Sequence, residues 1–169
     1  EVHNASQLPD TQLIGSQDPY VTVTLKRGAG AGCGGLDNAG ADGAAASHVR
    51  TQYISGGGVA PVWMDARKHK NVLYALLLPD VVSVLVQVWN ANYFSDTLID
   101  QVTLGVDAVR ARVGHKTELL LDKGGRLECT FSDIPAGQAM KLRGNSDVDD
   151  GHNEAAVAGA PGPRASVVV

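Results

Sequence analysis

The chain has 169 residues, which suits one domain, and hydrophobic residues make up 44% of it, which is enough for a sizeable core. Aromatic residues account for only 5%, so we expect that core to be mainly valine, leucine and alanine. A formal net charge of -4 argues against a general nucleic-acid binder, and no apolar run reaches the roughly 18–20 residues that span a bilayer.

Short segments rich in β-branched residues, with turn residues between them, predict a series of β-strands. Residues 20–25, for example, read YVTVTL and alternate along the strand. A short helix is expected only at 106–113. Seven or eight short strands with almost no helix predict an all-β sandwich of two sheets. The expected strands are residues 20–25, 49–54, 62–63, 71–78, 82–89, 98–106, 116–121 and 126–131.

Two segments differ in composition from the rest. Glycine and alanine dominate residues 28–47, which have little to bury and a high entropic cost of ordering, so we expect a flexible insertion there. A phosphate-binding loop is the alternative, although no helix signal and no Lys-Ser/Thr pair follow the glycines. Residues 138–169 carry DVDDGHNE and AGAPGPRAS and are expected to be a disordered tail, which leaves one folded domain over 1–137.

The cysteines and histidines show no metal-binding pattern. Cys33 and Cys129 lie in no C-x-x-C motif, and the five histidines are scattered without zinc spacing. Two free thiols are the expectation, with a disulfide or a metal site as the alternatives.

Five short motifs, in order along roughly residues 1–135, resemble signatures of the C2 domain family. The first is similar to "SDPYV", the second to a basic-Thr strand followed by "NPVW", the third to "VWDxD" and the fourth to "DFIG". The fifth, a Gly-Gly turn with the residues after it, is similar to the family's closing strand. In this chain they read Asp18-Pro19-Tyr20-Val21, Arg50-Thr51, Pro61-Val62-Trp63, Val88-Trp89-Asn90-x-Asn92, Leu98-Ile99 and Gly124-Gly125-Arg126-Leu127.

The resemblance implies an eight-stranded antiparallel Greek-key β-sandwich. Only one short strand, within residues 1–8, fits before Asp18, and residues 126–131 offer a further strand at the other end. We therefore expect the permuted (type II) strand topology, in which that strand comes last rather than first.

The resemblance also places a calcium site, which this sequence matches poorly. Calcium-dependent members of the family offer about five aspartates from two loops, because Ca²⁺ needs six to eight hard oxygen ligands. Asp18 matches one of them. Gln12 and Thr97 fall on two others, and Asn90 and Asn92 fall on the central pair.

Few carboxylates therefore remain for a dication, so no cofactor is expected to be required. A weak calcium site stays open as an alternative, with Asp10 and Asp96 lying near two of the replaced positions. The other interpretation is that the asparagines cap turns, as asparagine commonly does. The metal candidates are Asp10, Asp18, Asn90, Asn92 and Asp96.

Three loops that share one end of the C2 fold carry apolar residues at their tips. Leu13-Ile14 and Tyr93-Phe94 stand where a solvated turn would carry polar residues, and Val59 follows a bare glycine run. Clustered exposed apolar tips indicate a membrane or protein interface. The alternative is that one or more of these side chains folds back into the core.

A basic run precedes the strand expected at 71–78. Near an anionic leaflet each Lys or Arg contributes about 1 kcal/mol. A solvated loop is the alternative, and Thr22 and Thr24 lie where phosphoinositide-binding relatives carry lysines. The expected basic patch comprises Arg50, Arg67, Lys68 and Lys70.

No catalytic motif is found, neither G-x-S-x-G nor H-E-x-x-H. We therefore expect a non-enzymatic, cytoplasmic, peripheral module that docks on an anionic phospholipid surface largely without calcium, and that binds no nucleic acid. The alternatives are a protein–protein interaction or scaffolding module and a weak calcium-dependent phospholipid binder. The oligomeric state is left open by the sequence.

Overall fold

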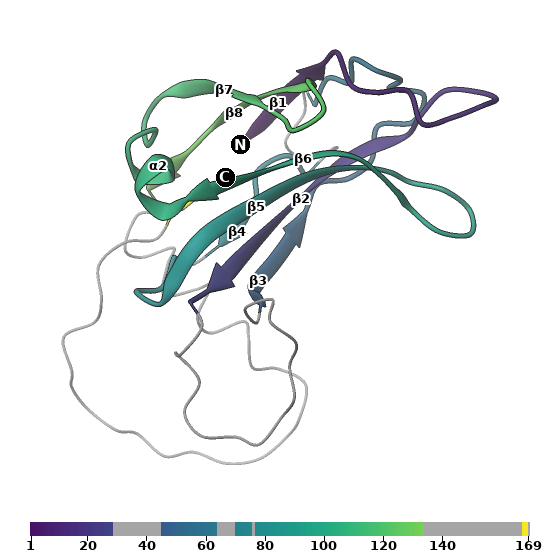
Figure 1. Ribbon diagram of the computed structural model, residues 1–169. Helices are drawn as coiled ribbons and strands as arrows, with labels where there is room; N and C mark the ends of the chain where they lie inside the picture. Colours follow the sequence, from purple (N-terminus) through teal and green to yellow (C-terminus); the bar gives the residue numbers. More distant parts are fainter. Residues whose placement is uncertain (29–44, 64–69, 76, 134–166, 169) are drawn as a thin grey trace, which may run out of the picture.

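Antiparallel strands make up most of the regular structure (Figure 1). The structure is a computed structural model that describes residues 1–28, 45–63, 70–75, 77–133 and 167–168. The strands form two larger sheets and one small one. The all-β prediction is therefore confirmed, with two antiparallel sheets as its main layers.

The first sheet has four strands in the order β3-β2-β5-β6. β2 and β5 form its centre, and the register places Val23 opposite Val86. Val84, Val86 and Val88 of β5 are buried on one face because the side chains of a strand alternate between its two faces, and Val21 and Val23 of β2 are buried with them. The strands are β2 (Pro19–Arg27), β3 (Ala45–Arg50), β5 (Val81–Asn90) and β6 (Thr97–Gly105).

The second sheet has the order β1-β8-β7, from β1 (Val2–Ser6), β8 (Arg126–Thr130) and β7 (Lys116–Leu120). β8, the last strand of this sheet in the sequence, lies between the other two. A further segment lies along the outer side of β1, where Trp63 donates its backbone N–H to the carbonyl of His3 at 2.7 Å. The predicted hairpin at 116–121 and 126–131 is thus found as β7 and β8.

A small third sheet has the order β4-β10-β9, from β4 (Tyr74–Ala75), β10 (Val167–Val168) and β9 (Ser132–Asp133). The only described residues of the expected C-terminal tail, 138–169, are the two that form β10; the rest lie outside the described residues. Of the expected insertion at 28–47, residues 29–44 lie outside the described residues, and β3 begins at Ala45.

Helix α2 (Val106–Arg110) connects the two larger sheets, between β6 and β7. Val106 and Val109 are buried on one of its faces. The predicted helix at 106–113 therefore exists and starts where expected, but it ends at Arg110.

The core lies between the two larger sheets, and one hydrophobic cluster draws residues from both. Trp63 and Phe131, its largest members, are almost completely buried. Asn71 is also buried, and its side-chain amide donates to the carbonyls of Val2 and Trp63 at 2.9 and 3.0 Å. The Asn71 side chain thus supplies hydrogen bonds at the edge of the second sheet, where no regular strand pairs with these carbonyls.

Candidate functional site

Three loops meet at one end of the molecule: the first loop (residues 7–18), the second loop (51–60) and the third loop (91–96). The first and third project from the same end in Figure 1, in purple and teal. The side-chain amide of Gln12 reaches Asn92 Oδ1 at 3.0 Å, and that of Gln17 reaches the carbonyl of Gly58 at 3.4 Å. The second and third loops are therefore each hydrogen-bonded to the first loop.

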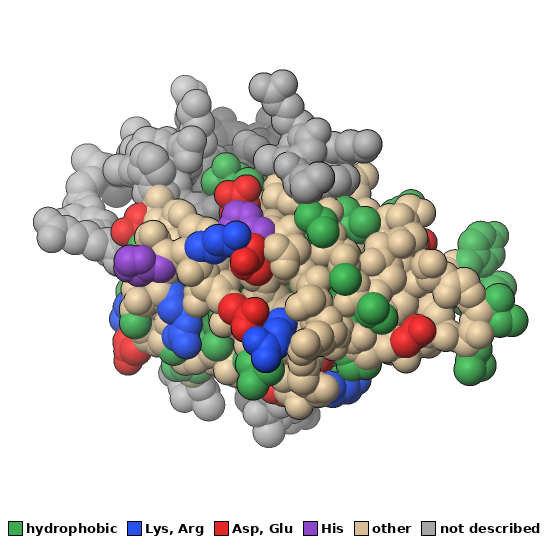
Figure 2. All heavy atoms as spheres, turned by 90° about the horizontal axis from the view of Figure 1, so that it is seen from above, with side chains coloured by type: hydrophobic (Ala, Val, Ile, Leu, Met, Phe, Trp, Pro, Cys, Tyr) green, Lys and Arg blue, Asp and Glu red, His purple; other side chains and the backbone are tan. Residues whose placement is uncertain are grey.

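The tips of the first and third loops carry fully exposed apolar side chains. Leu13 is 102% exposed and Ile14 90%, while Tyr93 and Phe94 are 94% and 95% exposed. The two aromatic rings pack edge to face with centroids 5.0 Å apart. Figure 2 shows hydrophobic side chains standing clear of the surface at one end of the molecule. Folding of these side chains back into the core, the alternative that the sequence left open, does not occur; Val59 in the second loop is 43% exposed.

Asp18 links the first loop to the other two. Its carboxylate Oδ1 accepts the backbone N–H of Gly56 at 2.7 Å, and its own N–H donates to Asn90 Oδ1 at 2.7 Å. Gly56 has a φ of 66°, in the left-handed region that favours glycine. The glycine run of the second loop therefore serves a turn that closes on Asp18.

Asn92 is the centre of an amide network between the first and third loops. Its Oδ1 accepts hydrogen bonds from Gln12 Nε2 and Asn90 Nδ2, both at 3.0 Å. Its Nδ2 donates to Thr97 Oγ1 at 3.0 Å and to the carbonyl of Ser95 at 3.2 Å. The neutral residues at the positions where the C2 resemblance expects aspartates thus bond to one another.

The remaining carboxylates of these loops are each occupied by local donors. Asp96 accepts the hydroxyl of Tyr20 at 2.6 Å and the N–H of Asn92 at 3.0 Å, and Asp10 accepts the N–H of Gln12 at 3.0 Å. Among the described residues, no group of three or more His, Cys, Asp or Glu is placed to hold a metal ion.

The hydrogen bond between Tyr20 and Asp96 moves the pKa values of the two groups in opposite directions. The Tyr20 hydroxyl, with the N–H of Asn92, lowers the pKa of Asp96. Burial, followed by this hydrogen bond, raises the pKa of Tyr20 to about 12. Tyr20 is therefore a neutral donor and Asp96 an anion across the physiological pH range.

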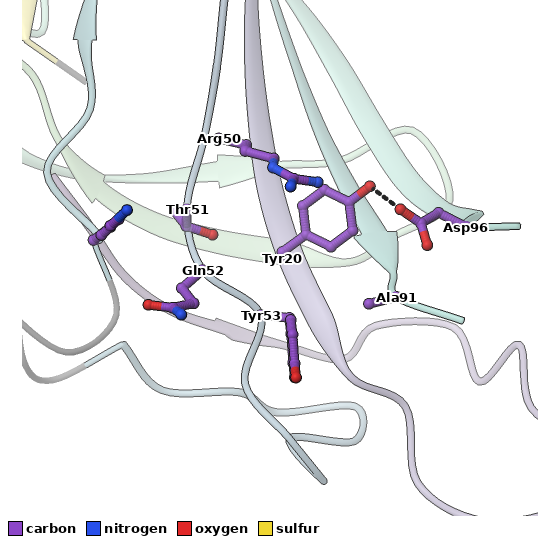
Figure 3. A pocket seen from close by; sticks show the side chains of 8 residues that line it. Tyr20, Arg50, Thr51, Gln52, Tyr53, Ala91 and Asp96 are labelled. Carbon is purple, nitrogen blue, oxygen red and sulfur yellow. Dashed lines mark hydrogen bonds between the residues drawn. The ribbon is translucent and has the colours of Figure 1, made fainter. Parts of the chain in front are cut away.

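A cavity of about 280 Å³ lies beside the base of the third loop (Figure 3). Arg50 lies over the ring of Tyr20, with its guanidinium carbon 5.6 Å from the ring centroid, at a distance that allows a cation–π contact. The wall also contains Tyr53, Lys70 and Asp96. Of the expected basic patch, Arg50 and Lys70 thus share one cavity, while Arg67 and Lys68 lie outside the described residues.

Two features of this end were missed by the sequence analysis. Gln17 is 1% exposed, and its Oε1 accepts the N–H and the hydroxyl of Thr11 at 3.0 and 2.7 Å. A buried glutamine inside a loop follows no periodic pattern, so nothing in the sequence signals it. The pairing of Tyr20 with Asp96 was also missed, because it joins residues 76 positions apart.

No protein-family model matches the chain, and no curated protein matches it. Among the residues that the structure describes, no helix is both long and apolar enough to cross a bilayer. Fold and loops by themselves define an all-β protein with two main antiparallel sheets and a hydrogen-bonded loop cluster that ends in exposed apolar side chains.

Proposed function

We propose that the chain is a non-catalytic C2-like module, an antiparallel Greek-key sandwich with the permuted strand topology. Support comes from the five ordered motifs and from the position of β8 between β1 and β7. In the permuted arrangement the strand that comes last in the sequence fills this place. The outer segment around Trp63, bonded to β1, supplies the fourth position of that sheet.

The module docks peripherally on a phospholipid surface, in the cytoplasm. The observation that carries this proposal is the set of four apolar side chains, each at least 90% exposed, at the tips of two neighbouring loops: Leu13, Ile14, Tyr93 and Phe94. Burying one Leu, Ile or Phe yields about 1.5–3 kcal/mol as an upper estimate. Four such side chains are enough for reversible binding without a metal ion.

Docking is largely independent of calcium. The first and third loops are joined by Gln12, Asn90 and Asn92, whose amides donate and accept from one another. A cation between carboxylates would make the same connection in a calcium-dependent relative. Here the amide hydrogens occupy that space and would repel a cation.

Co-sedimentation with phospholipid vesicles, in calcium and in chelator, tests the proposal. We expect the protein to bind in both conditions. A variant with Leu13→Ser, Ile14→Ser and Phe94→Ser should lose at least ten-fold in affinity, since the free energy of burying the removed apolar area exceeds about 1.4 kcal/mol. The matched control carries Leu120→Ser and Val82→Ser, at exposed strand positions away from the loops. A wild-type protein that ignores vesicles in both conditions contradicts the proposal.

The same experiment separates the two alternatives. Binding only in calcium would favour a weak calcium-dependent module on Asp10, Asp18 and Asp96. A protein-interaction module would not bind vesicles, and the variant with the three loop-tip substitutions would no longer bind the partner protein.

A further inference from the structure

The cavity beside the third loop carries charges of both signs. Figure 3 shows Arg50 over the ring of Tyr20 and Asp96 at the hydroxyl of that ring, with Tyr53 close by. Lys70 adds a second cation to the wall. Among the described residues neither Arg50 nor Lys70 forms an ion pair, so both cations are available to a ligand anion.

The position of the cavity relates it to the loop tips. Ala91 and Asp96 are the two ends of the third loop, and both line the cavity. Phe94 lies two residues from Asp96, which is at most about 7 Å of extended chain. Apolar side chains of peripheral proteins enter about 5–10 Å into the headgroup and acyl boundary. With Phe94 inserted, the cavity would lie at the depth of the lipid headgroups.

The charge of the cavity argues against a headgroup that carries several negative charges. Two cations and one carboxylate give a formal sum of +1, from Arg50, Lys70 and Asp96. Each phosphomonoester carries about -1.5 to -2, so a polyphosphoinositide would exceed this charge several-fold. Thr22 and Thr24 add no cation on the β2 strand, and the whole chain has a net charge of -4.

The size of the cavity and its aromatic residues restrict the choice of ligand further. A volume of about 280 Å³ lies just below the range of about 300–1,000 Å³ that holds drug-sized ligands, so it suits a headgroup rather than a whole lipid. Tyr53 is 51% exposed and is one of the residues that line the cavity. Aromatic faces beside a carboxylate are the surroundings that a quaternary ammonium group prefers.

We propose that this cavity binds the zwitterionic phosphodiester headgroup of a choline-type phospholipid, with the phosphate toward Arg50 and Lys70 and the ammonium toward Asp96 and Tyr53. The inference rests on the proposed docking function, because the loop tips bring the cavity to the bilayer. It also replaces the anionic surface expected from the basic run with a zwitterionic one.

Vesicles of phosphatidylcholine alone, and with added phosphatidylserine or a polyphosphoinositide, provide the first test. We expect Tyr53→Ala to lower the affinity for phosphatidylcholine vesicles about two- to five-fold, the size of an exposed cation–π contact. Asp96→Asn raises the cavity charge to +2 while keeping an acceptor for Tyr20. This variant should therefore bind phosphatidylcholine more weakly and anionic vesicles more strongly than the wild type does. Tyr74→Ala, at an exposed tyrosine on β4, is the control and should change neither.

Soluble glycerophosphocholine provides the second test, since it has the headgroup without the chains. We expect it to shift the NMR resonances of Tyr53 and Asp96, and these shifts to be lost in Tyr53→Ala. If vesicles do not bind but these shifts occur, the docking function fails and the headgroup site stands. If vesicles bind but glycerophosphocholine shifts nothing and a polyphosphoinositide strengthens binding, the headgroup site is overturned and the docking function stands.

Discussion

Asp100 shows how much one buried side chain contributes to this fold. It is fully buried, and its carboxylate accepts the backbone N–H groups of Gln101, Lys123 and Gly125 at 2.8, 2.9 and 3.0 Å. The last two lie in the turn between β7 and β8, so Asp100 ties β6 to the closing hairpin. Charge-assisted hydrogen bonds of this kind are stronger than neutral ones.

Replacing Asp100 by Ala should lower the free energy of unfolding by about 2–5 kcal/mol. The substitution leaves two turn N–H groups without their partner, and each unsatisfied buried donor costs about 1–3 kcal/mol. Urea denaturation followed by tryptophan fluorescence measures the change. Asp107→Ala is the control, since its side chain is 98% exposed and bonds only to Arg110. A loss below about 1 kcal/mol for Asp100→Ala would contradict the assigned role.

The exposure of single loop residues could be predicted from the sequence where their chemistry is unusual for their setting. Leu13, Ile14, Tyr93 and Phe94 are apolar residues in loop segments, and a loop rarely carries such a pair without a contact to make. The pocket formed by Arg50 with Tyr20 was not predictable. It depends on the distance between residues of different strands, which no local pattern encodes.

At the scale of structural elements, the amide network predicts how the first and third loops respond to calcium. Gln12, Asn90 and Asn92 bond to one another and to Thr97, while Asp18 and Asp96 lie beside them. With Asp10, Asp18 and Asp96 already present, changing the three amides to aspartates would place six carboxylates in the first loop, the third loop and the adjoining end of β5. Mutual repulsion should then loosen the loops unless a divalent cation joins them.

We expect the triple variant Gln12→Asp, Asn90→Asp and Asn92→Asp to be stabilised by calcium. At free calcium 100-fold above Kd, binding adds about 2.7 kcal/mol, which corresponds to a rise in Tm of roughly 5–11 °C. Thermal unfolding in calcium and in chelator measures it. The wild type should show no such rise. The matching triple alanine variant should lose stability in both conditions, and an equal response of all three proteins to calcium would refute the role of the network.

Strand prediction succeeded where alternation was complete and failed at ends set by side-chain hydrogen bonds. Residues 82–89 form most of β5 (Val81–Asn90), where buried and partly buried residues alternate from Val84 to Asn90. Residues 71–78 were predicted as one strand, but only Tyr74–Ala75 is a described strand there. The cause lies at Asn71, whose buried side chain bonds the carbonyls of Val2 and Trp63 in place of a regular ladder. Residues 49–54 likewise leave β3 after Arg50, and the N–H of Thr51 bonds the carbonyl of Val21.

At the scale of the whole molecule, the two larger sheets share one core, so they should unfold together. The hydrophobic cluster joins Val2 and Leu127 of one sheet to Val23 and Val86 of the other. Most small domains with a single core unfold in one cooperative transition. β8 lies at the centre of its sheet and contributes Cys129, which is 1% exposed.

Cys129 therefore offers a chemical probe of global unfolding. Burial raises the pKa of its thiol to about 11, and only the thiolate reacts with a disulfide reagent. In a Cys33→Ser background at pH 8, we expect Cys129 to be labelled only as fast as the whole domain opens, because β8 is bonded on both sides. Labelling rates and tryptophan fluorescence should then give the same free energy of unfolding across urea concentrations below the midpoint.

The same pKa shift sets the pH dependence of stability. The folded pKa of Cys129 lies above the ordinary thiol value of 9.0, so folding favours the protonated thiol and its contribution to stability is fully present below pH 9. Stability should fall as the pH rises from about 9 to about 11, by about 1.4 kcal/mol for each pH unit of that interval. In Cys129→Ala this part of the alkaline decline should disappear.

The labelling experiment also has an outcome that would contradict cooperative unfolding. If Cys129 is labelled within minutes in native buffer at pH 8 while fluorescence reports a folded domain, β8 opens locally and the two sheets do not unfold as one unit.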